Sequence, residues 1–272
     1  MKLLALIALA GLAHAQETAE TIMARVAENQ DRAEAARAGM VYEQDVLVRL
    51  HRSNRKLARE ESYQYVVTPT PTGISKEQKA FKGKYEKGGQ YIEYTEPGFE
   101  YKEMDIDGEL AHDLAEDMTN DKTRDGLSAD LFPLRKAEMR KYRFALKGRE
   151  QYRGQDVYVV RFDSKEKGFW TGEALIHAQE FQPVLITTWM ARGLPLVVKT
   201  LLGTDLKHLG FKLGYEKFDD GVWMPVSYGG ELRLRAVFVY KRNISISMRN
   251  TGFRRAKVDS SISYDLESAS RQ

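Results

Sequence analysis

The stretch YRFALK, residues 142–147, decides the fold class together with the segment that follows it. Its apolar side chains, Tyr142, Phe144 and Leu146, alternate with basic ones, which is the period of a strand with one buried face. A connection that begins and ends with glycine, residues 148–154, leads to a second run rich in β-branched and aromatic residues, QDVYVVRF at 155–162. The two runs predict an antiparallel pair of strands.

The same alternation continues along the chain on both sides of this pair. We expect strands at 42–50, 63–67, 81–94 (a hairpin around Gly88-Gly89), 173–177, 184–190, 211–218, 222–228, 233–240 and from 244 towards 258. Turn signals separate several of them, among them Gln182-Pro183 and Gly229-Gly230. Ahead of the strands, Gln16 to about Met40 carries apolar residues at helical spacing. One opening helix and about a dozen antiparallel strands favour a single curved sheet or open barrel.

Composition excludes several classes of protein. The 272 residues are 42% hydrophobic and 30% charged, which is ordinary for a globular protein and excludes disorder. There are 42 basic and 39 acidic residues, a net charge of +3, and the charges are interleaved rather than clustered as in a nucleic-acid-binding surface. The absence of cysteine excludes thiol catalysis, disulfides and lipidation through an N-terminal cysteine.

The first fifteen residues have the layout of a cleaved secretory signal peptide. Lys2 gives a positive start, 3–12 is an almost unbroken apolar run, and Ala13-His14-Ala15 is a small-x-small cleavage site. The apolar run is too short to cross a bilayer core of about 30 Å. We therefore expect an exported, soluble protein that does not span the membrane, with one domain at 16–258 and a polar tail at 259–272.

Residues that could carry catalysis are sparse. The histidines are isolated from one another, and neither a nucleophile elbow nor a phosphate-binding loop is present, so we expect no enzyme activity, no metal and no cofactor. Four carboxylates, Glu103, Asp105, Asp107 and Glu109, would line one face of a strand. They could bind a cation or act as an acid–base pair, but a solvated face that runs into a turn at Asp107-Gly108 is the simpler interpretation.

Three motifs together resemble a known family. They are the strand pair at 142–162, the segment GEALIH at 172–177 followed by PVLI at 183–186, and DGVWMP at 220–225. The last is similar to a D-G-x-W-x-P run of the LolA/LolB-like superfamily of bacterial periplasmic lipoprotein carriers and outer-membrane lipoprotein-sorting proteins. His177 stands where that family often has Asp.

The resemblance implies a fold and a function. The implied fold is mainly β with α: an incomplete antiparallel β-barrel, that is, a curved sheet, with an N-terminal helix and short helices closing its concave face. The implied function is that of a periplasmic carrier that binds acyl chains of a lipid or lipoprotein without catalysis. Envelope membrane proteins are the further partners that it implies.

Apolar residues in the second half of the chain are the candidate lining of such a cavity. They are Trp170, Phe181, Trp189, Met190, Leu194, Leu196, Val197, Val198, Leu201 and Leu202. The alternative is that they are ordinary core. Two other functions stay open: an envelope-stress sensor or protein-binding scaffold on the same fold, and an enzyme that uses the carboxylates at 103–109.

Overall fold

The computed structural model describes residues 17–70, 73–118, 135–165, 170–190, 205–218, 221–236 and 240–256. The expected signal peptide, the polar tail and the leucine-rich residues 191–204 lie outside these ranges. No helix among the described residues is both long and apolar enough to cross a membrane.

Helix α1 (Ala19–Arg37) opens the described chain, as the helical spacing predicts. Thr18 caps it, because its hydroxyl accepts a hydrogen bond from the Thr21 backbone N–H at 3.2 Å. Ile22, Met23 and Val26 are completely buried on one face. The polar side of α1 is tied to the turn after β7 (Trp170–His177), where the Asn29 side chain donates to the carbonyl oxygen of Glu180 at 2.7 Å.

Strands make up most of the other described residues. They are β1 (Met40–His51), β2 (Leu57–Thr70), β3 (Gly73–Lys87), β4 (Gln90–Tyr94), β5 (Tyr142–Tyr152), β6 (Gln155–Ser164), β7, β8 (Pro183–Met190), β9 (Asp205–Lys217), β10 (Trp223–Ala236) and β11 (Tyr240–Arg255). A second helix, α2 (Ile106–Met118), and a short 3-10 helix, η2 (Met139–Lys141), lie between β4 and β5.

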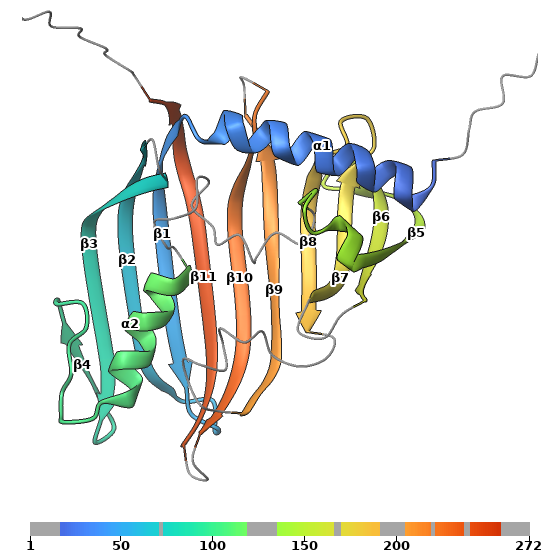
Figure 1. The fold of residues 1–272 in the computed structure, drawn as a ribbon. Coiled ribbons are helices and arrows are strands. Elements are labelled where there is room, and N and C mark those ends of the chain that lie inside the picture. Colours follow the sequence, from blue (N-terminus) through green and yellow to red (C-terminus); the bar gives the residue numbers. More distant parts are fainter. Residues whose placement is uncertain are drawn as a thin grey trace, which may run out of the picture.

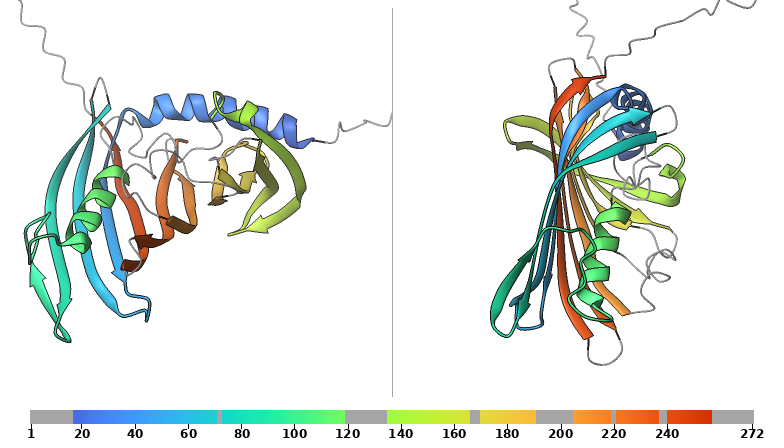
Figure 2. Two further views of the ribbon diagram at one scale, coloured as in Figure 1. Left: turned by 60° about the horizontal axis from the view of Figure 1, so that its bottom comes forward. Right: turned by 90° about the vertical axis from the view of Figure 1, so that its left-hand side faces the viewer.

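All eleven of these strands join one antiparallel sheet in the order β4-β3-β2-β1-β11-β10-β9-β8-β7-β6-β5. The first and last of these strands, β1 and β11, pair in its interior, and β4 and β5 form its two edges. The sheet is therefore open, and it curves around α1 and α2, which lie on its concave side (Figures 1 and 2). The expected open curved sheet with an N-terminal helix is confirmed.

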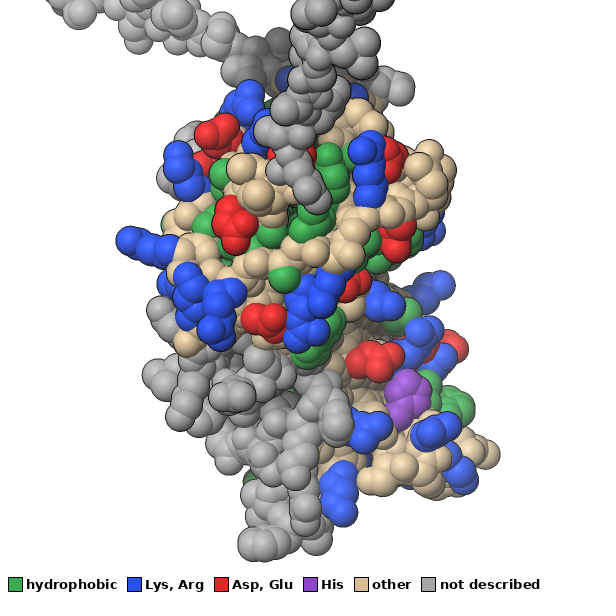
Figure 3. All heavy atoms as spheres, turned by 90° about the vertical axis from the view of Figure 1, so that its right-hand side faces the viewer, with side chains coloured by type: hydrophobic (Ala, Val, Ile, Leu, Met, Phe, Trp, Pro, Cys, Tyr) green, Lys and Arg blue, Asp and Glu red, His purple; other side chains and the backbone are tan. Residues whose placement is uncertain are grey.

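The two faces of the sheet differ in their side chains. On β11, Ile244, Ile246 and Met248 point to the concave side and are buried, whereas Ser245 and Ser247 between them point to the convex side. We call these the inner and the outer face. Seen from the side of β5, acidic and basic side chains are intermixed over the surface (Figure 3).

One expected turn is wrong. The pair Gly229-Gly230 does not separate two strands but lies inside β10, where both residues pair with β9 and with β11. Glycine permits a turn but does not require one, and here the alternation of inner and outer positions continues through it. The expected strands at 222–228 and 233–240 therefore belong largely to one long strand.

Candidate functional site

One row of apolar side chains crosses the inner face almost from edge to edge. The strand register places one residue from each of ten neighbouring strands side by side. In order they are Leu146, Val160, Ala174, Ile186, Leu213, Tyr228, Met248, Val46, Tyr63 and Phe81. Neighbouring strands lie about 4.8 Å apart, so these residues form a continuous apolar track across the strands. We call them the apolar row.

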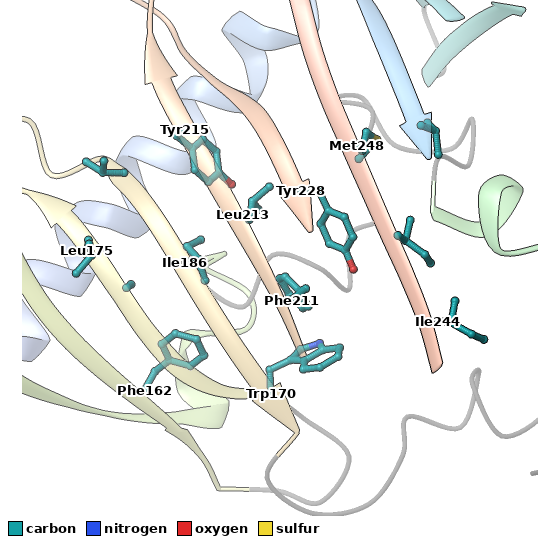
Figure 4. Close-up of a cluster of buried hydrophobic side chains, with 14 of the residues drawn as sticks. Phe162, Trp170, Leu175, Ile186, Phe211, Leu213, Tyr215, Tyr228, Ile244 and Met248 are labelled. Atoms are coloured by element: carbon teal, nitrogen blue, oxygen red, sulfur yellow. The ribbon is translucent and has the colours of Figure 1, made fainter. Parts of the chain in front are cut away.

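Aromatic rings extend this track in the middle of the sheet. The ring of Phe211 lies 4.8 Å from that of Trp170 in an edge-to-face arrangement, and 5.5 Å from that of Tyr228 (Figure 4). All three side chains are buried. Burial also raises the pKa of the Tyr228 hydroxyl, which therefore stays protonated. This part of the inner face offers apolar surface and no charged group among the residues of the row.

Helices α1 and α2 pack on different strands of the inner face. Helix α2 packs on β1 and β2, and α1 packs on β5 and β10. In Figure 1, α1 crosses one end of the strands, and α2 lies over the half of the sheet that contains β1 and β2. The strands that carry Ile186 and Leu213, β8 and β9, lie between the two strands that α1 contacts.

Buried charges occupy the inner face under the start of α2. The Arg59 guanidinium donates to Glu61 at 2.8 Å and to Asp105 at 2.7 Å, and it also donates to the carbonyl oxygen of Phe99. The side chains of Arg59 and Glu61 are fully buried, and that of Asp105 is 1% exposed. Burial disfavours the charged form of Arg59, but Tyr94, Glu61 and Asp105 outweigh it, so its pKa is raised.

Two tyrosines complete the hydrogen bonding of Glu61. The Tyr94 hydroxyl donates to Glu61 at 2.6 Å, and the Tyr63 hydroxyl donates to the other carboxylate oxygen. Burial and the Glu61 charge raise the pKa of both phenols well above the ordinary value. We call Arg59, Glu61, Asp105, Tyr63 and Tyr94 the Arg59 cluster. Its polar groups bind one another, so it joins β2, β4 and the start of α2 rather than presenting a reactive group.

A second ion pair holds the first turn of α2 to β11. Arg242 donates to both carboxylate oxygens of Asp107, at 2.8 and 2.7 Å, and the Tyr240 hydroxyl donates to the same carboxylate. The expected strand carrying carboxylates 103–109 is thus wrong, because α2 begins at Ile106. Acidic residues at every second position resemble a strand. In the structure they instead lead into and begin α2, and Asp105 and Asp107 bind Arg59 of β2 and Arg242 of β11. Among the described residues no group of acidic and histidine side chains is suited to hold a metal ion.

The sequence-predicted lining residues are found in different places. Trp170 lies on the inner face beside the apolar row. Phe181 lies in the β7–β8 turn, where the Arg25 guanidinium of α1 sits 4.6 Å from its ring centre. Trp189 lies on the outer face and is 40% exposed. The side chain of Met190 and all of Leu194, Leu196, Val197, Val198, Leu201 and Leu202 lie outside the described residues.

Sequence reasoning missed the residues that dominate the described inner face. Phe211 and Leu213 were expected only as strand residues, although their spacing of two already put them on one face. Arg59 and Glu61 also carried a signal: both are in phase with Tyr63 on the same strand, so they belong to the buried face. Charged residues in a buried phase predict a paired cluster.

Comparisons with known proteins give low similarity. No family model matches, and no curated protein matches. A solved LolA superfamily protein from Nitrosomonas europaea is 14% identical, with a TM-score of 0.36 over 89% of this chain and 95% of that one. A domain described as an outer membrane lipoprotein-sorting protein, from Vibrio parahaemolyticus, is 12% identical, with a TM-score of 0.38 over 86% and 93%.

A third solved structure is a complex of two proteins. It contains MucA and MucB from Pseudomonas aeruginosa. Its matched chain is 9% identical to this one, with a TM-score of 0.23 over 85% of this chain and 99% of that one. The first two structures are named for the group that the sequence motifs resemble. Because the scores are low, the fold class rests on the strand pairing of this chain itself.

Proposed function

We propose that this chain is a carrier-type protein that binds acyl chains of a lipid or lipoprotein against the inner face of its sheet, without catalysis. The observation that carries the proposal is the apolar row. An acyl chain needs a long apolar surface and no reactive group, and each CH₂ that it buries contributes about 0.8 kcal/mol. The row supplies a continuous line of apolar side chains across ten strands, nearly all of them buried in this structure.

The position of the charged groups supports the same function. The Arg59 cluster and the Asp107–Arg242 pair both lie at the start of α2, and the hydrogen bonds of both stay within the protein. Charges so placed anchor a helix at one side of the inner face. The row itself carries no charged side chain, and only its Tyr63 takes part in the Arg59 cluster, through its hydroxyl. The signal-peptide layout and the family resemblance support the further proposal that this carrier acts in the periplasm, in the sorting of outer-membrane lipoproteins.

Native mass spectrometry with lipid extraction, on protein purified from the periplasm, tests the proposal. Co-purifying phospholipid or acylated peptide is the expected result. The variant Val160→Thr puts a hydroxyl in the apolar row and is expected to lower lipid recovery several-fold, because an acyl chain cannot pair with that hydroxyl.

Val159→Thr is the matched control. It makes the same change one residue earlier on β6, where the side chain is also buried but points to the outer face. It should cost similar stability and leave lipid recovery unchanged. Equal loss in both variants, or an apo mass that gains nothing when lipids are offered, would contradict the carrier function. The latter result would favour a protein-binding module on the same fold.

A further inference from the structure

The outer face of the sheet is hollowed over β9, β10 and β11. A recess of about 570 Å³ lies there, and glycine and serine residues of these three strands form its floor. They are Gly210, Gly229, Ser245 and Ser247. The walls are formed by Leu47 and Arg49 of β1 on one side and by Thr187 of β8 on the other. We call this the outer recess; the apolar row lies on the opposite face of the same strands.

Among the described residues, nothing packs against Gly229 in a way that would require a glycine there. A β-carbon built on it has nothing within 4 Å, and its φ is not positive. By contrast, a β-carbon on Gly210 would lie 2.7 Å from the carbonyl oxygen of Thr188. Glycine inside a strand lowers stability, since it orders a freer backbone and packs no side chain. Gly229 itself stays in register with β9 and β11, and a glycine of this kind leaves room for another molecule to approach the backbone closely.

Most residues that line the outer recess are neutral, but the charged groups at its border and in the adjoining recess are mainly cationic. Arg49 and Lys212 border it, and an adjoining recess of about 420 Å³ adds Arg55 and Arg233; Glu231 lies in both. Arg49 is paired with Glu60. Within the part of the chain that the structure describes, neither Lys212 nor Arg233 forms an ion pair, and both are exposed. An excess of positive charge around a polar floor favours an anionic partner.

The shape selects among anionic partners. A flat membrane surface cannot reach a floor that lies below Arg49 and Thr187, whereas an extended chain can. The floor also offers serine hydroxyls for hydrogen bonds with peptide groups.

We propose that the outer recess docks an extended acidic peptide segment of a partner protein, with the peptide backbone over Gly229 and its carboxylates facing Lys212 and Arg233. The proposal does not depend on whether the inner face holds acyl chains.

Fluorescence anisotropy with a fluorescein-labelled oligo-glutamate peptide tests it, with oligo-lysine of the same length as the control. Binding of the oligo-glutamate should weaken as salt is added. Lys212→Glu should reduce affinity roughly tenfold by repulsion, whereas Glu231→Gln should increase it because it removes the acid in the recess.

The variant Gly229→Val tests peptide binding in the outer recess most specifically. Valine has a high strand propensity and meets open space here, so the variant should melt at or above the wild-type temperature. Its side chain would nevertheless stand where the peptide backbone lies, and affinity should fall at least about tenfold. Thr68→Val, an exposed position on β2 away from the recess, is the control and should bind like the wild type.

Several results would overturn the proposal. One is equal affinity of Gly229→Val and the wild type for oligo-glutamate. A second is binding to vesicles that contain anionic phospholipid but not to the peptide. A third is a change of oligomeric state in Gly229→Val, which would assign the recess to a contact between copies of this chain. Val160→Thr, which alters only the inner face, should bind the peptide normally, so failure of this proposal is distinguishable from failure of the carrier function.

Discussion

The inner face is built in two different ways in its two halves. Under α2 it buries charged groups, with Arg59 held by Glu61 and Asp105. Over β6 to β11 it buries apolar side chains such as Ile186 and Leu213. Buried ion pairs are directional and leave one arrangement, whereas apolar contacts are non-directional and tolerate rearrangement. The half with the charges is therefore suited to fix α2, and the apolar half is suited to adapt to a ligand.

The largest effect is expected from removing the centre of the Arg59 cluster. Arg59→Met leaves Glu61 and Asp105 buried without their cation, which should lower the free energy of unfolding by about 4 kcal/mol. Urea denaturation measures this. Arg49→Met is the control: it also breaks an arginine–glutamate pair, but Arg49 is 44% exposed, so the change should be within about 1 kcal/mol. Similar values for the two variants would remove the distinction between the cluster and a surface pair.

A cavity in the apolar half should cost somewhat less. Leu213→Ala removes a completely buried side chain and should lower the free energy of unfolding by about 3 kcal/mol. Because Leu213 and α2 lie in different halves, hydrogen exchange of the α2 amides relative to global unfolding should not change. Faster exchange confined to α2 would show that the two halves are coupled.

The Asp107–Arg242 pair should have a smaller and more local effect. Asp107→Asn removes the charge that Arg242 and Tyr240 bind, which should cost about 2 kcal/mol and speed hydrogen exchange in α2 more than in the sheet. Glu109→Gln, an exposed change in the same turn, should leave exchange unaltered. If both variants exchange alike, the pair does not hold the helix.

The smallest effect concerns Glu180 and depends on pH. Burial opposes its charged form, but hydrogen bonds from Lys217 and Trp223, both 2.9 Å long, outweigh it and lower the pKa of Glu180. A carboxyl group with a lowered pKa stabilises the folded state at pH values above its ordinary pKa. This stabilisation is lost as the pH falls through the folded-state pKa. Glu180→Gln should therefore be less stable at neutral pH, by no more than about 1 kcal/mol, and equal to the wild type in acid. Thermal melts of Glu180→Gln and the wild type from neutral to acidic pH measure this difference in stability. A difference that persists in acid would contradict the prediction.

Local alternation was enough to predict much of the fold but not the arrangement of its charges. The pair β5–β6 follows directly from residues 142–162, because apolar residues alternate with more polar ones at 142–147 and a run rich in β-branched and aromatic residues follows. Gly229-Gly230 misled the prediction, because a glycine pair fits a turn and a strand equally well. The partners Arg59–Asp105 and Arg242–Asp107 are 46 and 135 residues apart, and such contacts leave no local pattern. The expected lining residues between 194 and 202 remain a prediction.

Helix α1 has a mechanical consequence for the sheet. It contacts β5 near one edge and β10 in the interior, and its side chains bind the β7–β8 turn between them. Its 19 residues make a rod about 28 Å long. Because this stiff helix is bound to the curved sheet at separated points, the sheet cannot flatten between them unless one of these contacts breaks. The length of α1 therefore limits how far this part of the sheet can open.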